Sequence, residues 1–287
     1  MGAQSYESKV GYQVRDTMIA KIVRLQILFG EVRIYLQPFC FIKKLRSQFL
    51  RKRGDGVNEV LRQEKKYLMT LQNVKKLTGK LSQVLVEDEH NGADGYSIRS
   101  LYFDTPYDDD FQDKVDGLLL RKKIRLRIYD PKAKTAKLEM KQKEGMYQRK
   151  RSLKLSREDA KALIRGDYGV LLKYSEPFAA ECYGVMCMKG YRPKTVVEYL
   201  RKAYIAKENS IRVTFDSKII ATEARYDIFA EDLNFYPVLD PFNAVLEVKY
   251  NGFLLSYIKN LLDSADRSEL SVSKYCLARG ISCGFVV

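Results

Sequence analysis

The sequence predicts an α+β fold in which an antiparallel β-sheet closes into an eight-stranded barrel flanked by helices. Most segments after residue 56 alternate apolar and charged residues with a period of two, as strands with two unlike faces do. Several of these segments are joined by connections short enough for antiparallel hairpins. The charged positions also recur from strand to strand, which favours a closed sheet with a polar interior. No repeat or linker interrupts 57–287, so we expect one domain there.

The strands are predicted first from this alternation. In the segment 121–130, Arg125 and Arg127 fall on one side of an extended chain, and Ile124, Leu126 and Ile128 fall on the other. The three segments between residues 118 and 156 have connections suited to a meander. The eight expected strands are 58–70, 96–106, 118–130, 136–145, 147–156, 195–206, 210–220 and 244–252.

Helices are expected between these strands. The segment 74–85 is amphipathic with a helical period, and 156–166 begins at a Ser cap and ends at Gly. We also expect helical structure over 167–192 and a helix over 254–263. The final segment, 271–280, is polar and cationic, and its periodicity favours no particular structure.

The chain is strongly basic, with 51 Lys and Arg against 36 Asp and Glu and a net charge of +15. Such an excess indicates nucleic acid, an anionic membrane surface or a polyanionic small ligand as partner. Residues 1–56 hold eleven of these cations and four of the acids. This N-terminal extension is a disordered segment, a basic arm, or a translated stretch foreign to the native protein, and no function is based on it.

The residue inventory excludes several classes of site. The single histidine, His90, lies in a loop-like segment, which disfavours a Ser-His-Asp triad and a structural zinc site. Five cysteines without a CxxC pair indicate buried, reduced thiols in a cytoplasmic protein. No apolar run reaches the ~20 residues of a membrane span. We therefore expect a cytoplasmic protein, with the inner face of the membrane as a second possible location.

Charged residues at i, i+2 spacing, with apolar neighbours between them, recur on several strands. They are Glu64/Lys66, Arg125/Arg127, Lys137/Glu139/Lys141 and Glu247/Lys249, with single cations at Arg99, Arg201 and Arg212. On any one strand, a solvated outer face is the ordinary interpretation. Repeated around a barrel, the pattern favours cations that line the interior, which requires a ligand such as triphosphate or polyphosphate. The carboxylates Glu64, Glu139 and Glu247 could then hold Mn²⁺ or Mg²⁺, or could neutralise neighbouring lysines.

Eight motifs along 57–280 together resemble the VTC domain. They are RQEKKYLMT (62–70), IRSLYFDTP (98–106), RKKIRLRIY (121–129), KLEMKQKEG (137–145), EYLRKAY (198–204), IRVTFD (211–216), VLEVKY (245–250) and SKYC (273–276). This family is the polyphosphate polymerase domain of the vacuolar transporter chaperone complex and occurs also in bacterial proteins. It belongs to the triphosphate tunnel metalloenzymes, whose fold is an antiparallel eight-stranded barrel.

The resemblance implies roles for particular residues. As catalytic cations it implies Lys66, Arg125, Arg127, Lys141, Arg201 and Arg212. As phosphate-binding residues we add Arg99, Lys150, Lys249, Ser273 and Lys274, where Arg149 or Arg151 could take the role of Lys150. As a metal ligand it implies Glu247, to which we add the inward carboxylates Glu64 and Glu139 as candidate ligands.

Two positions depart from the family pattern. Hydrolytic relatives begin with an ExExK strand, whereas Arg62 replaces the first carboxylate here. The polymerase also carries a lysine two residues before its Ser-Lys step, where this chain has Ser271.

The leading hypothesis is a metal-dependent enzyme that transfers the γ-phosphate of ATP to inorganic polyphosphate. A triphosphatase or a non-catalytic polyphosphate- or nucleotide-binding module of the same fold is the alternative. Nucleic-acid binding, with Tyr67, Tyr102, Phe103 and Tyr129 as stacking platforms, is a distant third. A membrane partner protein is left open.

Overall fold

A computed structural model of the chain describes residues 62–145, 147–264, 267–269 and 273–284. The N-terminal extension and Ser271 lie outside these residues. The strands are β1 (Arg62–Thr70), β2 (Val86–Glu87), β3 (Tyr96–Asp104), β4 (Leu120–Ile128), β5 (Thr135–Glu144), β6 (Tyr147–Ser156), β7 (Arg192–Ala206), β8 (Ile211–Thr222), β9 (Tyr236–Pro237), β10 (Asn243–Asn251) and β11 (Ser268–Glu269). The helices are α3 (Leu71–Leu81), α4 (Asp109–Val115), α5 (Arg157–Ile164), α6 (Pro177–Met188), α7 (Ser256–Asp263) and α8 (Lys274–Ser282), with 3₁₀ turns η1 (Tyr168–Lys173) and η2 (Glu208–Ser210).

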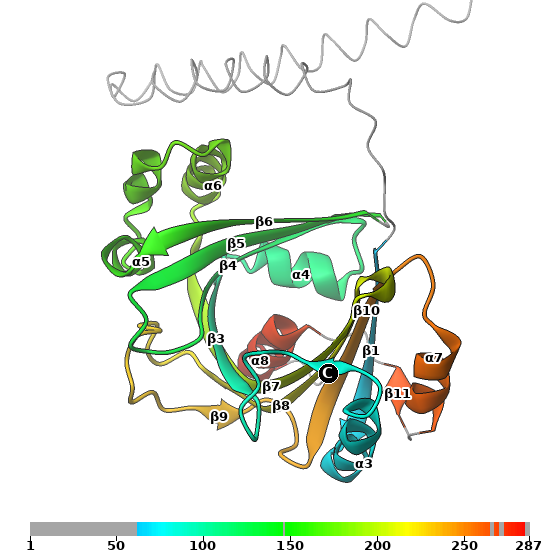
Figure 1. The fold of residues 1–287 in the computed structure, drawn as a ribbon. Coiled ribbons are helices and arrows are strands. Elements are labelled where there is room, and N and C mark those ends of the chain that lie inside the picture. The colour runs from blue at the N-terminus through cyan, green and yellow to red at the C-terminus, as the bar shows by residue number, and fades with distance from the viewer. Residues whose placement is uncertain (1–61, 146, 265–266, 270–272, 285–287) are drawn as a thin grey trace, which may run out of the picture. The chain divides into compact units, whose positions relative to one another are not determined.

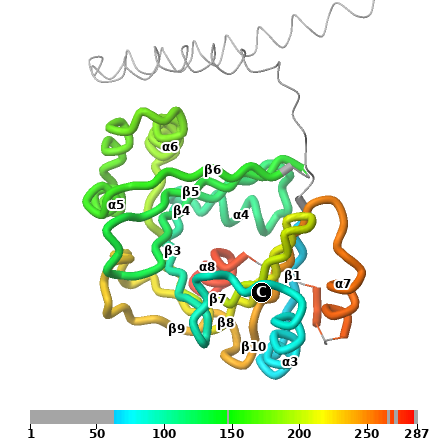
Figure 2. Tube along the Cα trace, in the orientation of Figure 1, coloured from blue at the N-terminus to red at the C-terminus, as the bar shows by residue number. Residues whose placement is uncertain are grey.

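All strands belong to one antiparallel sheet, in the order β11-β1-β10-β8-β7-β3-β4-β5-β6, with β2 on β7 and β9 on β8. The first long strand, β1, pairs with β10 near the other end of the chain, and Figure 2 shows the two side by side. The eight predicted strands are all present, and the α+β class is confirmed. The three further strands have two residues each, which is too short for a period of two to be recognised.

The predicted closure into an eight-stranded barrel is not confirmed. The main ladder of nine strands ends at β11 and β6, and no pairing between these edges closes it in the described part of the chain. The sheet is nevertheless strongly curved, so that the part formed by β4, β5 and β6 faces the part formed by β7, β8 and β10 (Figure 1). Register shifts at Tyr102/Phe103 and at Glu198/Leu200 mark irregularities of the kind that bend strands. Side-chain alternation identifies the two faces of a strand, but it does not determine whether the outermost strands meet.

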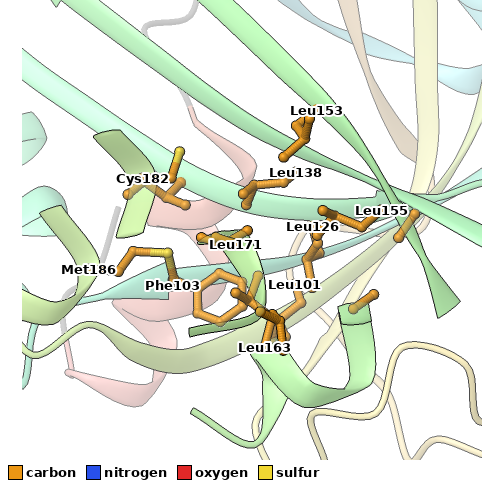
Figure 3. Close-up of a cluster of buried hydrophobic side chains, with 14 of the residues drawn as sticks. Leu101, Phe103, Leu126, Leu138, Leu153, Leu155, Leu163, Leu171, Cys182 and Met186 are labelled. Carbon is orange, nitrogen blue, oxygen red and sulfur yellow. The ribbon is translucent and has the colours of Figure 1, made fainter. Parts of the chain in front are cut away.

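One face of this sheet packs against helices. Ile124, Leu126 and Ile128 of β4 are at most 1 % exposed and belong to an apolar cluster with residues of α5, η1 and α6. Figure 3 shows Leu126 and Leu138 in this cluster together with Leu163 and Leu171. Arg125 and Arg127 therefore lie on the opposite face, which we call the inner face. The expectation that the apolar residues of β4 point outward, under helices, is confirmed.

Two further apolar clusters complete the core. One lies between α3, α7 and the outer face of β8 and β10, and contains Leu77, Phe215 and Leu246. The other lies on the inner face, where Tyr275 and Cys276 of α8 pack with Tyr102 and Tyr199. Helix α8 thus covers one part of the inner face and leaves another part to charged side chains.

Side-chain caps begin two of the helices in the described residues, α3 at Thr70 and α5 at Ser156. The Ser156 side chain accepts a hydrogen bond from the Asp159 N–H, so the predicted cap of α5 is confirmed. Helices α4 and α8 were not predicted. Helix α4 has only seven residues, and the buried residues of α8 are mostly consecutive, so neither shows a clear helical period. No helix in the described segments is long and apolar enough to cross a membrane.

Cysteines in the described residues are free thiols. The prediction that they are buried is confirmed for Cys182 and Cys276, whereas Cys187 and Cys283 are exposed.

Candidate functional site

The charged residues of seven strands share the inner face because paired residues in an antiparallel ladder point to the same side of the sheet. Arg125 pairs with Glu139, and Lys141 pairs with both Lys123 and Lys150. On the same face, but further along the strand order, Lys66 of β1 pairs with Glu247 of β10, and Glu64 pairs with Lys249. Arg201 of β7 pairs with Asp216 of β8. We call the following residues the inner-face cluster: Glu64, Lys66, Lys123, Arg125, Arg127, Glu139, Lys141, Lys150, Arg201, Arg212, Asp216, Glu247, Lys249 and, from α8, Lys274.

Two carboxylates on adjacent strands, Glu64 of β1 and Glu247 of β10, share their lysine partners. Lys66 Nζ lies 3.0 Å from Glu64 Oε1 and 3.9 Å from Glu247 Oε2. Lys249 forms an ion pair with Glu247 and lies 3.8 Å from Glu64. Lys141 Nζ of β5 also donates to Glu64, at 3.1 Å. Side chains of β1 and β5 therefore meet across the inner face, although the backbone ladder does not close.

The charges of this group are fixed by their mutual contacts. Burial and the neighbouring Glu247 raise the pKa of Glu64, but Lys66, Lys141 and Lys249 outweigh them and bring that pKa to about 2. Burial opposes the ionisation of Glu247 as well, and Lys249 and Lys66 hold its pKa well below the ordinary range. Burial lowers the pKa values of Lys141 and Lys249 despite these carboxylates. The lysines are thus crowded cations, which an added anion would stabilise.

Glu139 of β5 forms a second centre. Arg125 Nε donates to its Oε2 at 2.7 Å, Arg127 lies 3.6 Å away, and Lys150 Nζ of β6 lies 2.6 Å from Oε1. Burial raises the pKa of Glu139, and the three cations bring it to about 2. Arg125 also donates to the Tyr102 hydroxyl at 3.0 Å. Glu139 therefore orients the arginine pair.

Asp216 of β8 anchors a third group. Its carboxylate is fully buried and accepts two hydrogen bonds from Arg201, at 2.6 and 2.7 Å, and one from Lys274 at 2.5 Å. These two cations hold the pKa of Asp216 low against the effect of burial. Ser273, the residue before α8, lies 2.5 Å from Lys123 Nζ. The start of α8 is thereby attached to the inner face.

Sequence reasoning missed Asp216, although it ends the motif IRVTFD and follows Arg212 and Thr214 at a spacing of two. This spacing places Asp216 on the same side of the strand as Arg212, and it could have identified Asp216 as a site residue. Arg212, which was predicted, lies at the edge of the cluster and donates to Asp88 at 2.8 Å and to the Tyr96 hydroxyl at 3.1 Å.

Arg99 does not join the cluster. It pairs with Ile128 of β4, so it lies on the outer face, and it donates to Glu198 and to the carbonyls of Ile228 and Ala230. The predicted phosphate-binding role of Arg99 is therefore not supported by its position. Its partners indicate a structural role, because a buried guanidinium requires acceptors for its N–H groups.

The register also decides among the basic residues of β6. Lys150 pairs with Lys141 and faces the cluster, whereas Arg149 pairs with Gln142 on the outer face. Arg151 also lies on the outer face, where it binds Glu181 of α6. Lys150 is thus the residue of this strand that contacts the cluster.

A divalent cation fits the pair Glu64 and Glu247 better than it fits Glu139. Among the described residues, no group of three or more His, Cys, Asp or Glu side chains could hold a metal. Glu64 and Glu247 share two lysines and could offer a pair of carboxylates, a donor set that suits Mg²⁺ or Mn²⁺ when phosphate and water oxygens complete the shell. Glu139 is paired with Arg125, Arg127 and Lys150, so its cation partners differ from those that Glu64 and Glu247 share.

The cluster contains many more cations than carboxylates. Several of these cations are arginines, whose planar donors match phosphate oxygens, and others are lysines on flexible stems. Such a set can bind a chain of phosphates and neutralise charge on it. One cysteine, Cys276 of α8, also contacts the set, with its Sγ 3.6 Å from Lys123 Nζ.

Comparison with known proteins gives one family match. The family model described as VTC domain matches residues 61–282. A Bacillus halodurans structure provisionally described as an adenylate cyclase shares 12% identity over 71% of this chain and 88% of its own, with a TM-score of 0.41. A Vibrio parahaemolyticus structure with the same provisional description shares 15% identity over 74% of this chain and 94% of its own, with a TM-score of 0.39. No curated protein matches the sequence.

Proposed function

Because the chain belongs to the VTC domain family, we propose that it is a metal-dependent polyphosphate polymerase that uses ATP. The observation that carries this proposal is the convergence of cations from β1, β4, β5, β6, β7, β8, β10 and α8 on one face of the sheet. A row of phosphates satisfies these cations better than their few carboxylate partners do.

In this proposal, the triphosphate of ATP lies between Arg125, Arg127, Arg201 and Lys66. A terminal oxygen of phosphate or of a growing chain attacks the γ-phosphorus. The bond from the γ-phosphorus to the bridging oxygen breaks, ADP leaves, and the acceptor is one phosphate longer. The residues act by positioning the reactants and neutralising charge, which is the usual basis of phosphoryl transfer.

Glu64 and Glu247 are the residues that would hold Mn²⁺ or Mg²⁺. When bound, such an ion neutralises charge on phosphate oxygens. The ammonium groups of Lys66 and Lys249 contact both carboxylates and keep them oriented before a ligand binds.

The test is polymer synthesis by the full-length protein with ATP and MnCl₂, followed on gels stained for polyphosphate. Arg201→Gln is expected to abolish synthesis, because Arg201 is anchored by a buried carboxylate and faces the cluster. Lys189→Gln is the matched control, since Lys189 is an exposed residue at the end of α6. Absence of polymer from the wild type, or equal synthesis by Arg201→Gln, would refute the proposal.

Hydrolysis of triphosphate is the second candidate. It is favoured by Glu64, a carboxylate retained on the first strand and placed beside Glu247. Release of orthophosphate without chain growth in the same assay would identify a triphosphatase. Binding of tripolyphosphate without turnover would identify a non-catalytic module.

A further inference from the structure

Three rings follow one another at the edge of the inner-face cluster. The centroid of Tyr96 lies 6.1 Å from that of His90 and 6.2 Å from that of Tyr129, with tilted planes. His90 precedes β3, Tyr96 begins it, and Tyr129 follows the last residue of β4. We call these residues the aromatic ledge.

The aromatic ledge is accessible rather than part of the core. The His90 side chain is 69 % exposed and Tyr129 is 46 % exposed, and neither belongs to an apolar cluster. Tyr96 packs at the margin of the inner apolar cluster. Exposed rings of this kind lose solvation and gain contact area when another flat ring is placed on them.

The ledge is held in place by the same residues that border the phosphate site. Arg212 donates to the Tyr96 hydroxyl at 3.1 Å and to Asp88 at 2.8 Å. Asp88 in turn accepts from the His90 backbone N–H at 3.1 Å and lies 2.9 Å from the His90 ring nitrogen Nδ1. Tyr96 also pairs in register with Arg201. A molecule whose phosphates reach Arg201 and Arg212 therefore has the ledge beside it.

Glycine contributes to this arrangement at one position. Gly95 precedes Tyr96 with a φ of +98°, and a Cβ there would collide with the Arg201 carbonyl. The chain can therefore approach β7 closely and bring Tyr96 beside the cluster.

Lys137 places a cation on the ledge. Its ammonium lies over the Tyr129 ring, 5.6 Å from the centroid, and the residue is exposed. Its flexible stem allows the ammonium to leave the ring and turn toward a phosphate, since Lys137 pairs with Arg127 on the inner face. The ring face then becomes available to an aromatic ligand.

From these contacts we infer that the aromatic ledge binds the base of a nucleoside triphosphate whose phosphates occupy the inner-face cluster. The inference rests on the proposed function and extends it, because it assigns the part of the ligand that inorganic tripolyphosphate lacks.

The test compares ATP with inorganic tripolyphosphate by calorimetry on the full-length protein. Wild type is expected to bind ATP about tenfold more tightly, in line with the measured contribution of stacking one base on an aromatic side chain. Tyr129→Ala and His90→Ala should each reduce this ratio toward one while leaving tripolyphosphate affinity unchanged. Tyr107→Ala is the control, because Tyr107 is 85 % exposed and outside the ledge.

A second readout uses the absence of tryptophan from the chain. Tyr129→Trp introduces a single tryptophan, which can be excited selectively at about 295 nm and whose emission ATP should quench and tripolyphosphate should not, whereas Tyr107→Trp should respond to neither. Far-ultraviolet circular dichroism confirms that each variant folds.

Equal affinities of the wild type for the two ligands would overturn the ledge assignment while leaving the proposed function intact. Equal quenching of Tyr129→Trp by both ligands would also overturn it. A decameric adenine oligonucleotide that binds more tightly than ATP would reassign the ledge to single strands. Failure of both ATP and tripolyphosphate to bind would instead reject the phosphate site itself, and the ledge with it.

Discussion

Glu139→Gln separates the structural and functional roles of the carboxylate that lies among Arg125, Arg127 and Lys150. The substitution keeps the size of the side chain and removes its charge. Glu139 is buried, with 4 % of its side chain exposed, so solvent does not screen these ion pairs strongly. The variant leaves three cations of the site without their shared counter-charge.

The magnitude follows from the pKa of Glu139. Its ordinary value is 4.5, and the fold lowers it to about 2, which corresponds to roughly 3 kcal/mol in favour of the ionised form. Because the folded-state pKa is depressed, this stability is present above pH 4.5 and is lost as the pH falls through 2. We expect Glu139→Gln to lose about 3 kcal/mol at pH 7, or about 6–12 °C in Tm for a domain of this size.

The assay is thermal unfolding of wild type and variant between pH 7 and pH 3, with and without tripolyphosphate. The difference in Tm should narrow as the pH falls from 4.5 to about 3, since the carboxylate of the unfolded wild type binds a proton in this range and that of the folded wild type does not. Tripolyphosphate should stabilise the variant more than the wild type, because it replaces the missing charge. Glu144→Gln, an exposed substitution on the same strand, is the control.

Two results would refute this reasoning. The first is a loss of stability in Glu139→Gln no larger than in Glu144→Gln at pH 7. The second is a difference from wild type that stays constant down to pH 3, which would mean that the carboxylate charge is not the cause.

Further predictions concern the outer face and a buried carboxylate. Arg99→Gln should lower Tm, since it leaves Glu198 without its partner, but should not change tripolyphosphate affinity in calorimetry; a weakened affinity would contradict its placement. Ile124→Ala should cost about 2–5 kcal/mol in denaturant unfolding, whereas a loss under 1 kcal/mol would mean that this face is not buried. Burial raises the pKa of Asp110 from 3.8 to about 6, because the ionised carboxylate is disfavoured in the folded protein. The protein therefore loses stability as the pH rises from about 4 to about 6. Asp110→Asn should therefore gain stability relative to wild type across that range, by roughly 3 kcal/mol, and a flat difference in Tm against pH would contradict this.

The faces of the strands could be predicted because side-chain direction is a local property of an extended chain. Alternation alone placed Arg125 and Arg127 opposite Ile124, Leu126 and Ile128, and it predicted eight strands that the structure contains. The inward orientation of the arginines required the further comparison of several strands, since one amphipathic strand does not say which face is covered.

Other features depended on register and on long-range contacts. Arg99 resembled the other cations of the pattern, and only its pairing with Ile128 placed it on the outer face. The contact between Glu64 and Lys141 joins residues 77 positions apart, and the pairing of Lys274 with Asp216 joins residues 58 apart. No local pattern encodes such contacts.

By itself, then, the sequence determined the strands, their two faces and the basic character of the site, because backbone geometry and side-chain chemistry act over a few residues. Tertiary structure decided that the ladder does not close, that Glu139 has other cation partners than Glu64 and Glu247, and that the start of α8 contacts the inner face. These features depend on sheet curvature and strand register, which arise from the packing of the whole domain.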